Sequence, residues 1–141
     1  NDALVYKAEW EGVFDKVLCD APCSGFGVAS KKPDIYLFTT MAQVQQLSKL
    51  QYSILTNASH YVARGGTLVY STCTILRQEN YNIVGKFVKE NPEWTIEKHK
   101  QYLPSKEGYD GFFVAVLKKK EDSMQTEIAT DSGNQILTEE I

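Results

Sequence analysis

The sequence predicts an α/β domain in which buried strands alternate with amphipathic helices. Residues 14–19 and 67–71 are short apolar runs without the polar alternation of a half-exposed strand, which is typical of strands inside a parallel sheet. Between them, apolar side chains recur at helical spacing over residues 41–61. A strand, a helix and a second strand in this order predict a parallel β-α-β unit with a right-handed crossover.

The long helix between these strands carries boundary signals at both ends. Thr40 and Gln43 have the spacing of a capping box at the start of a helix. Gly65 and Gly66 are expected to end the helix, because glycine readily adopts the left-handed conformation that closes many helices. Residues 21–37, which precede the helix, are predicted to form a loop because glycine and proline interrupt them.

The second half of the chain predicts further elements of the same kind. A second helix is expected over residues 79–90, followed by a short strand at 94–96 and a stronger one at 112–117. Residues 1–120 are therefore expected to form one domain. Residues 121–141 are polar and acidic, and they are expected to form a mobile tail without regular structure.

The composition limits the class of protein. The chain has 141 residues, of which 43% are hydrophobic and 23% are charged, as in an ordinary soluble domain. Its net charge of −3 argues against a domain that grips nucleic acid through charge alone. No apolar run is long enough to span a bilayer, and no signal peptide is recognisable. Three cysteines do not suit a disulfide framework, so free thiols in the cytoplasm are expected.

Two cysteines lie just after the two predicted buried strands. Cys23 lies in the segment DAPCSG (20–25), and Cys73 lies in the segment STCT (71–74). The carboxyl ends of strands in an open α/β sheet line one crevice, and ligands bind there. The two thiols are therefore expected to meet over one substrate, as a nucleophile and a helper in covalent catalysis.

Clustered thiols also suggest zinc, but the spacing does not favour it. Cys19 and Cys23 are separated by three residues, and His60 and His99 are isolated in the sequence. Structural zinc sites need four ligands in tighter pairs, so no metal is expected. Cys19 falls inside a predicted strand and is expected to be a buried core residue.

These motifs resemble the RNA cytosine-C5 methyltransferases, a family that includes the bacterial Sun-type 16S ribosomal RNA enzymes. The resemblance covers roughly residues 14–118 and rests on ordered segments: DAPCSG (20–25), GV and KPDI (27–35), GGTLVYSTCT (65–74), Glu79-Asn80 and DGFF (110–113). It implies the Rossmann-like fold of S-adenosylmethionine-dependent methyltransferases, with only the carboxyl-terminal half of the sheet in this chain. The glycine-rich cofactor loop and the acidic residue of the family's first two strands are not found. The amino-terminal half of the same protein is therefore an expected partner, and the chain alone is expected to be inactive.

The resemblance implies methyl transfer from S-adenosylmethionine to carbon 5 of a cytosine in RNA, with 16S ribosomal RNA as the expected substrate. Carbon 5 is a weak nucleophile until a thiolate adds at carbon 6, and a base must later remove its proton. By resemblance, Cys73 is the nucleophile and Cys23 assists product release. Two alternatives stay open. A DNA cytosine-C5 methyltransferase would use the Pro-Cys thiol of Cys23 as nucleophile, and a non-catalytic Rossmann-like fragment would only bind a partner.

Further residues are expected to contact the cofactor or the substrate. Asp20, at the end of its strand, is expected to hold the edge of the cytosine or to face the cofactor, although capping the next loop is a plainer role. By resemblance, Pro22 belongs to the cofactor pocket and Asp2 contacts the adenine of the cofactor. Lys31 and Lys32 are expected to contact RNA phosphates, or else to form a solvated basic turn.

Overall fold

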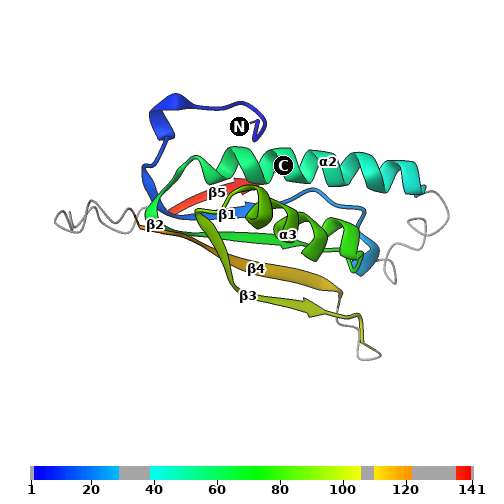
Figure 1. Ribbon diagram of the computed structural model, residues 1–141. Helices are drawn as coiled ribbons and strands as arrows, with labels where there is room; N and C mark the ends of the chain where they lie inside the picture. The colour runs from blue at the N-terminus through cyan, green and yellow to red at the C-terminus, as the bar shows by residue number, and fades with distance from the viewer. Residues whose placement is uncertain (1, 29–38, 106–109, 122–135, 141) are drawn as a thin grey trace.

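The structure is a computed structural model that describes residues 2–28, 39–105, 110–121 and the backbone of 136–140. Five strands make up one sheet: β1 (Phe14–Asp20), β2 (Val62–Thr72), β3 (Trp94–Tyr102), β4 (Phe112–Lys119) and β5 (Ile136–Glu140). Their order across the sheet is β3-β4-β2-β1-β5. Two helices, α2 (Met41–Ser59) and α3 (Tyr81–Glu90), pack on one face of it (Figure 1). Single 3-10 turns complete the described elements: η1 (Ala8–Trp10), η2 (Phe26–Val28) and η3 (Arg77–Glu79).

The predicted parallel unit is confirmed in β1, α2 and β2. β1 and β2 are parallel, with Leu18 opposite Val69 in the register. The capping box at the start of α2 is also confirmed: the Gln43 amide donates to Thr40 Oγ1 at 3.2 Å, and the Thr40 amide donates to Gln43 Oε1 at 2.8 Å. Local side-chain chemistry therefore sets where this helix begins.

The predicted end of α2 is wrong. The helix ends at Ser59, and β2 begins at Val62, well before the glycine pair. Gly65 has a φ of +75° inside β2, where the register with β1 is irregular. The glycine therefore accommodates extra residues in a bulged strand instead of closing a helix.

The second half of the sheet is antiparallel, which corrects the expectation of parallel units throughout. β4 lies between β2 and β3 and is antiparallel to both. Only residues 103–111 separate β3 from β4, and a parallel connection needs a crossover of a dozen residues or more. The third strand is also longer than predicted, since it continues from residue 96 to Tyr102.

The end of the chain differs from the expected tail. The backbone of Ile136–Glu140 pairs in parallel with β1, so that Lys16 lies opposite Ile136 and Asp20 lies opposite Glu140. Without this strand, the outer N–H and C=O groups of β1 would form an open sheet edge, which is the physical reason for the pairing. Residues 122–135 lie outside the described part of the chain.

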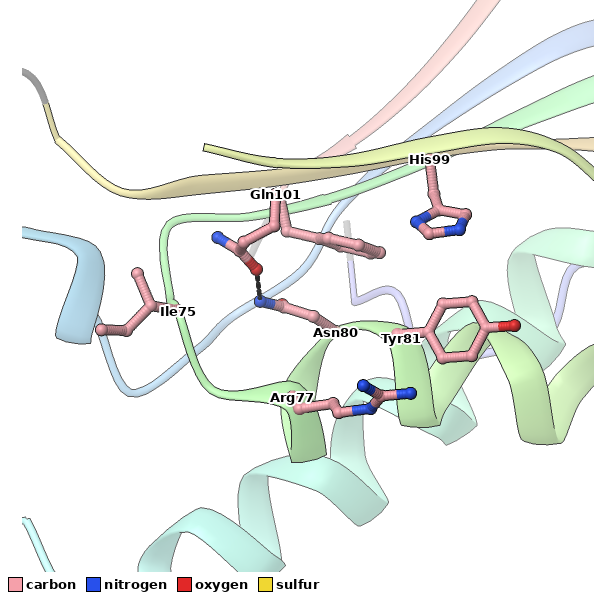
Figure 2. A pocket seen from close by; sticks show the side chains of 7 residues that line it. Ile75, Arg77, Asn80, Tyr81, His99 and Gln101 are labelled. Atoms are coloured by element: carbon pink, nitrogen blue, oxygen red, sulfur yellow. Dashed lines mark hydrogen bonds between the residues drawn. The ribbon is translucent and has the colours of Figure 1, made fainter. Parts of the chain in front are cut away.

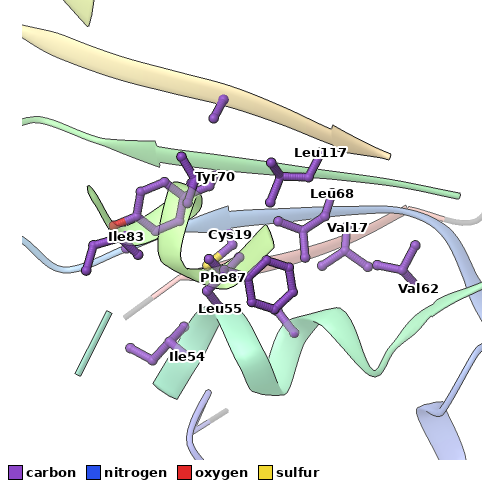
Figure 3. Packing of buried hydrophobic residues seen from close by; sticks show 14 of the residues in the cluster. Val17, Cys19, Ile54, Leu55, Val62, Leu68, Tyr70, Ile83, Phe87 and Leu117 are labelled. Carbon is purple, nitrogen blue, oxygen red and sulfur yellow. The ribbon is translucent and has the colours of Figure 1, made fainter. Parts of the chain in front are cut away.

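The core lies between the helices and one face of the sheet (Figure 3). Cys19 is fully buried there, as expected, in the same cluster as Leu55 and Phe87. On the opposite face, Leu18 and Val69 are only half-buried. In the described part of the chain, no helix is both long and apolar enough to cross a bilayer. Packing on one face holds β1 and β2 firmly, so that their carboxyl ends share one edge.

Candidate active site

Two thiols meet at the carboxyl edge of the sheet. The ends of β1 and β2 lie side by side because Asp20 is opposite Ser71 and the Ala21 amide donates to the Ser71 carbonyl at 2.9 Å. The loops that follow bring Cys23 Sγ and Cys73 Sγ to 3.0 Å from each other. Residues that are 50 positions apart in the sequence therefore form one thiol pair.

The two thiols differ in acidity. A hydrogen bond from Cys23 is the main cause that lowers the pKa of Cys73 from 9.0 to about 7. The same hydrogen bond, followed by burial, raises the pKa of Cys23. Cys73 is also the more exposed of the two, so its negative charge is better solvated. Within the pair, ionisation is therefore favoured at Cys73, with the Cys23 thiol as the hydrogen-bond donor.

A buried carboxylate holds the two thiol loops together. Glu79 has no exposed surface, and its Oε1 accepts hydrogen bonds from the Ser24 amide at 2.7 Å and from Gln51 Nε2 at 3.1 Å. Its Oε2 accepts from the hydroxyls of Ser24 and Thr74 at 2.6 and 2.8 Å. Each hydroxyl has one proton, so with both directed at Glu79 the 3.0 Å contact between these two hydroxyl oxygens is no further hydrogen bond. Four donors compensate for burying the charge and connect the loop after β1 to the loop after β2.

The backbone around Cys73 is fixed from three sides. The Gly27 amide donates to the Cys73 carbonyl at 2.9 Å. The side-chain amides of Asn80 and Gln101 donate to the Thr74 carbonyl at 2.9 and 3.3 Å. The sequence did not predict these supporting roles, or that of Glu79. The only signal was the occurrence of Glu79-Asn80 among the resembling segments.

The other expected site residues are placed differently. The exposed Asp20 accepts a hydrogen bond from Ser71 Oγ at 3.1 Å, and its charge opposes ionisation of Cys73. Pro22 also lies at the thiol edge, where its carbonyl accepts from Gln51 Nε2 at 2.7 Å. Lys31 and Lys32 lie outside the described residues.

Asp2 lies by the carboxyl-terminal half of α2, since Asn57 Nδ2 donates to the carbonyl of the next residue, Ala3, at 2.6 Å. Pro22 and Cys23 lie along the same helix, where Pro22 binds Gln51 and Cys23 shares a groove with residues from Gln43 to Leu50. The expected contact of Asp2 with the adenine of the cofactor stays a prediction.

Comparisons with known proteins identify the family of this chain. The sequence model of the family described as "16S rRNA methyltransferase RsmB/F" matches residues 2–118. The probable ribosomal RNA small subunit methyltransferase B of Bacillus subtilis is 40% identical, over 76% of this chain and 28% of its own length. The ribosomal RNA small subunit methyltransferase B of Citrobacter koseri is also 40% identical, over 82% of this chain and 29% of its own. The chain thus spans less than a third of these relatives.

Solved structures show the same fold. NSun6 from Pyrococcus horikoshii, crystallised with the S-adenosylmethionine analogue SFG, superposes with a TM-score of 0.71 and 30% identity, over 86% of this chain and 34% of that one. A methyltransferase homologue from the same organism gives a TM-score of 0.61 and 26% identity, over 75% and 39% of the two chains. The expected Rossmann-like methyltransferase fold is confirmed. The match over most of its residues, together with this shared fold, shows that the chain belongs to the RsmB/F family of 16S ribosomal RNA methyltransferases.

Proposed function

We propose that this chain supplies the thiol chemistry for methylating carbon 5 of a cytosine in RNA, with 16S ribosomal RNA as the substrate. The observation that carries the proposal is the 3.0 Å contact between Cys73 and Cys23, which lowers the pKa of Cys73 and raises that of Cys23. This covalent mechanism needs one sulfur that attacks the base and a second group that removes the carbon 5 proton. Both are free thiols, which fits an enzyme of the reducing cytoplasm.

In the first half of the reaction, the Cys73 thiolate adds to carbon 6 of the cytosine. A carbon–sulfur bond forms, the carbon 5–carbon 6 double bond opens, and its electron pair makes carbon 5 nucleophilic. Asp20 holds the edge of the base that carries N3 and the exocyclic amine. The cytosine must leave its stack for this attack, because carbon 6 is reached from a face of the ring.

In the second half, Cys23 acts as the base. Once the sulfur of Cys73 is bonded to carbon, it no longer carries the charge that holds the proton on Cys23. The pKa of Cys23 then falls, and its proton passes to solvent. After methylation, the Cys23 thiolate takes the carbon 5 proton, the bond to carbon 6 breaks, and Cys73 leaves as a thiolate.

S-adenosylmethionine, when bound, supplies an electrophilic methyl group for carbon 5. Asp20 and Pro22 are the described residues at the thiol edge that would face it. The expected contact of Asp2 with the adenine stays a prediction. Because the chain spans less than a third of its curated relatives, we expect the 141 residues by themselves to perform thiol addition but no methyl turnover.

The test measures thiol addition without a methyl donor. After the thiol has added to carbon 6, carbon 5 can take up a deuteron from deuterated water. Loss of the original carbon 5 proton and of the thiol then restores cytidine, which now carries deuterium at carbon 5. Mass spectrometry of the recovered RNA would detect this exchange with the wild-type chain. The Cys73→Ser variant should show none. Exchange that survives this substitution would contradict the proposal.

The Cys23→Ser variant separates the RNA proposal from the DNA alternative. If Cys73 is the nucleophile, this variant should still add to carbon 6 at alkaline pH but should lack the base that removes the carbon 5 proton, so a covalent adduct between protein and RNA should persist and be visible by mass spectrometry. An enzyme that attacks through Cys23 would form no adduct in this variant. A non-catalytic scaffold would show neither exchange nor adduct with any variant.

A further inference from the structure

A groove lies between the sheet and the segment that leads into α3, on the face of the sheet that the helices cover (Figure 2). Its volume is about 380 Å³, within the range of sites that hold small organic ligands. It is formed by side chains from the segment after β2, from η3 and α3, and from β3 and β4: Ile75, Arg77, Asn80, Tyr81, His99, Gln101 and Phe113. The thiol chemistry described above makes no use of this groove.

The side chains of the groove wall bind the backbone next to Cys73. The Thr74 carbonyl, one residue after Cys73, accepts hydrogen bonds from Asn80 and Gln101 in the groove wall. Ile75 is only two residues from Cys73, so their Cα atoms are at most about 7 Å apart. A stacked strand rises about 3.4 Å per nucleotide, and a strand whose target base has left the stack is more extended. A strand that places one base over Cys73 therefore brings a neighbouring nucleotide to the groove.

The lining offers flat aromatic surfaces. The ring centroids of Tyr81 and His99 are 4.8 Å apart, and those of His99 and Phe113 are 6.4 Å apart. Tyr81 and His99 are both exposed, so a ligand can reach them from solvent. Unstacked RNA bases bind to such rings, and the stacking tolerates any base because every base has a π face.

The charge of the lining suits a phosphate. Arg77 is the charged residue among the seven that line the groove, and none of these is acidic. Its guanidinium lies 5.2 Å from the centre of the Tyr81 ring, and its Nε donates to Asn82 Oδ1 at 3.3 Å. The planar guanidinium is well suited to bind phosphate oxygens in pairs.

The amides in the groove wall are engaged within the protein. Asn80 donates to Thr74 and Gln101 and accepts from the Thr72 hydroxyl. Gln101 Nε2 shares its two protons among three carbonyls, those of Tyr102 and Phe112 at 3.0 Å each and that of Thr74 at 3.3 Å. These amides therefore support the groove and do not read the edge of a base. Stacking and charge remain, and both position a nucleotide without selecting its sequence.

We propose that this groove binds the nucleotide adjacent to the target cytosine, with its base stacked on Tyr81 and His99 and its phosphate paired with Arg77. The inference rests on the proposed RNA substrate. It adds a binding site to that function: the groove orients the strand so that the cytosine faces Cys73.

The test uses the full chain and a short single-stranded oligoribonucleotide with one cytidine next to 2-aminopurine, whose fluorescence falls when it stacks. Tyr81→Ala should weaken binding by about ten- to a hundredfold and abolish the quenching, whereas Tyr81→Phe should keep both. An abasic nucleotide at the same position should weaken binding to the wild type but not to Tyr81→Ala. Arg77→Gln should reduce the salt dependence of binding by about one phosphate contact.

Tyr102→Ala is the matched control. Tyr102 is an exposed tyrosine of β3 with the Lys100 ammonium 4.7 Å from its ring centre. In the register it lies opposite Phe112, whereas the groove residue Gln101 lies opposite Phe113, so Tyr102 is on the other face of the sheet. Its substitution should leave RNA binding unchanged.

Equal RNA binding by the wild type and Tyr81→Ala, or no RNA binding by the chain, would overturn the groove proposal. Exchange at carbon 5 that depends on Cys73 would leave the proposed function standing in that case. Conversely, stacking that depends on Tyr81, without any exchange, would contradict the proposed function alone.

Discussion

At the scale of the residue, surroundings decide what each cysteine does. Cys19 is fully buried in the core, where a thiol behaves as a small apolar side chain. Cys23 is half-buried and keeps its proton, while Cys73 is exposed and ionises more easily. The same functional group therefore serves as a core residue, as a hydrogen-bond donor and, in the proposed mechanism, as the nucleophile.

The acidity of Cys73 makes a prediction about its reactivity. Because its pKa is lowered to about 7, its alkylation by iodoacetamide should rise with pH around a midpoint near 7. Removing the donor in Cys23→Ala should move the midpoint up toward 9.0, so that less thiolate is present at neutral pH. Cys23→Ser keeps a hydroxyl donor and should give an intermediate value. Mass spectrometry of the peptide with Cys73 measures the rate, and an unchanged midpoint in Cys23→Ala would refute the assigned cause.

At the scale of the element, the site depends on contacts between loops and helices. Glu79 connects the loop after β1, the loop after β2 and Gln51 of α2. Gly27 lies between the loop after β2 and the residue before β4, since its amide donates to Cys73 and its carbonyl accepts from Gly111 at 2.7 Å. These two residues together keep the thiol loops at a fixed separation.

Replacing Glu79 by glutamine tests the carboxylate. Glu79→Gln replaces one of the two carboxylate oxygens by an NH2 group, which cannot accept a hydrogen bond. At least one of the buried donors that bind Glu79 in the wild type would therefore lose its acceptor. Such a loss costs about 1–3 kcal/mol, which urea denaturation would detect as a smaller free energy of unfolding. Glu97→Gln, on the exposed surface of β3, is the control and should change stability by less than about 0.5 kcal/mol. Equal stabilities of the two variants would argue against the role of Glu79.

Adding a methyl group at Gly27 tests the close approach of the loops. A Cβ there would lie 2.2 Å from the Gly111 carbonyl oxygen and 2.5 Å from that of Cys73, and backbone atoms cannot move aside cheaply. We expect Gly27→Ala to lower the free energy of unfolding by about 1–3 kcal/mol and to slow alkylation of Cys73. In Gly85→Ala the nearest atom is Tyr81 Cε1 at 3.6 Å, and the change within a helix should stabilise the fold by about 0.5–1 kcal/mol. Destabilisation of similar size in both variants would show that the clash at Gly27 is not the cause.

At the scale of the whole molecule, the sheet gathers the chemistry at one edge. β1, β2 and β3 run in the same direction, so the thiol pair and the groove share the edge where these strands end. The helices cover a single face, and on the other face residues such as Leu18 and Val69 are half-buried. The chain spans less than a third of its curated relatives. The chemistry that we propose for it is therefore limited to the thiols and the groove.

The sequence by itself determined the features that depend on neighbours along the chain. Buried strands show as apolar runs, the start of α2 shows in the pair Thr40 and Gln43, and the cysteine motifs follow their strands directly. Each of these signals spans only a few residues, so no knowledge of the fold is needed to recognise it.

Only the tertiary structure decided the features that depend on distant residues. The bulge at Gly65 requires β1 beside it, and β4 lies between β2 and β3 because it pairs with both of them. The acidity of Cys73 comes from a thiol 50 positions away, and the role of Glu79 comes from a partner 55 positions away. Through-space hydrogen bonds, burial and ring contacts produce these properties, and they exist only once the chain has folded.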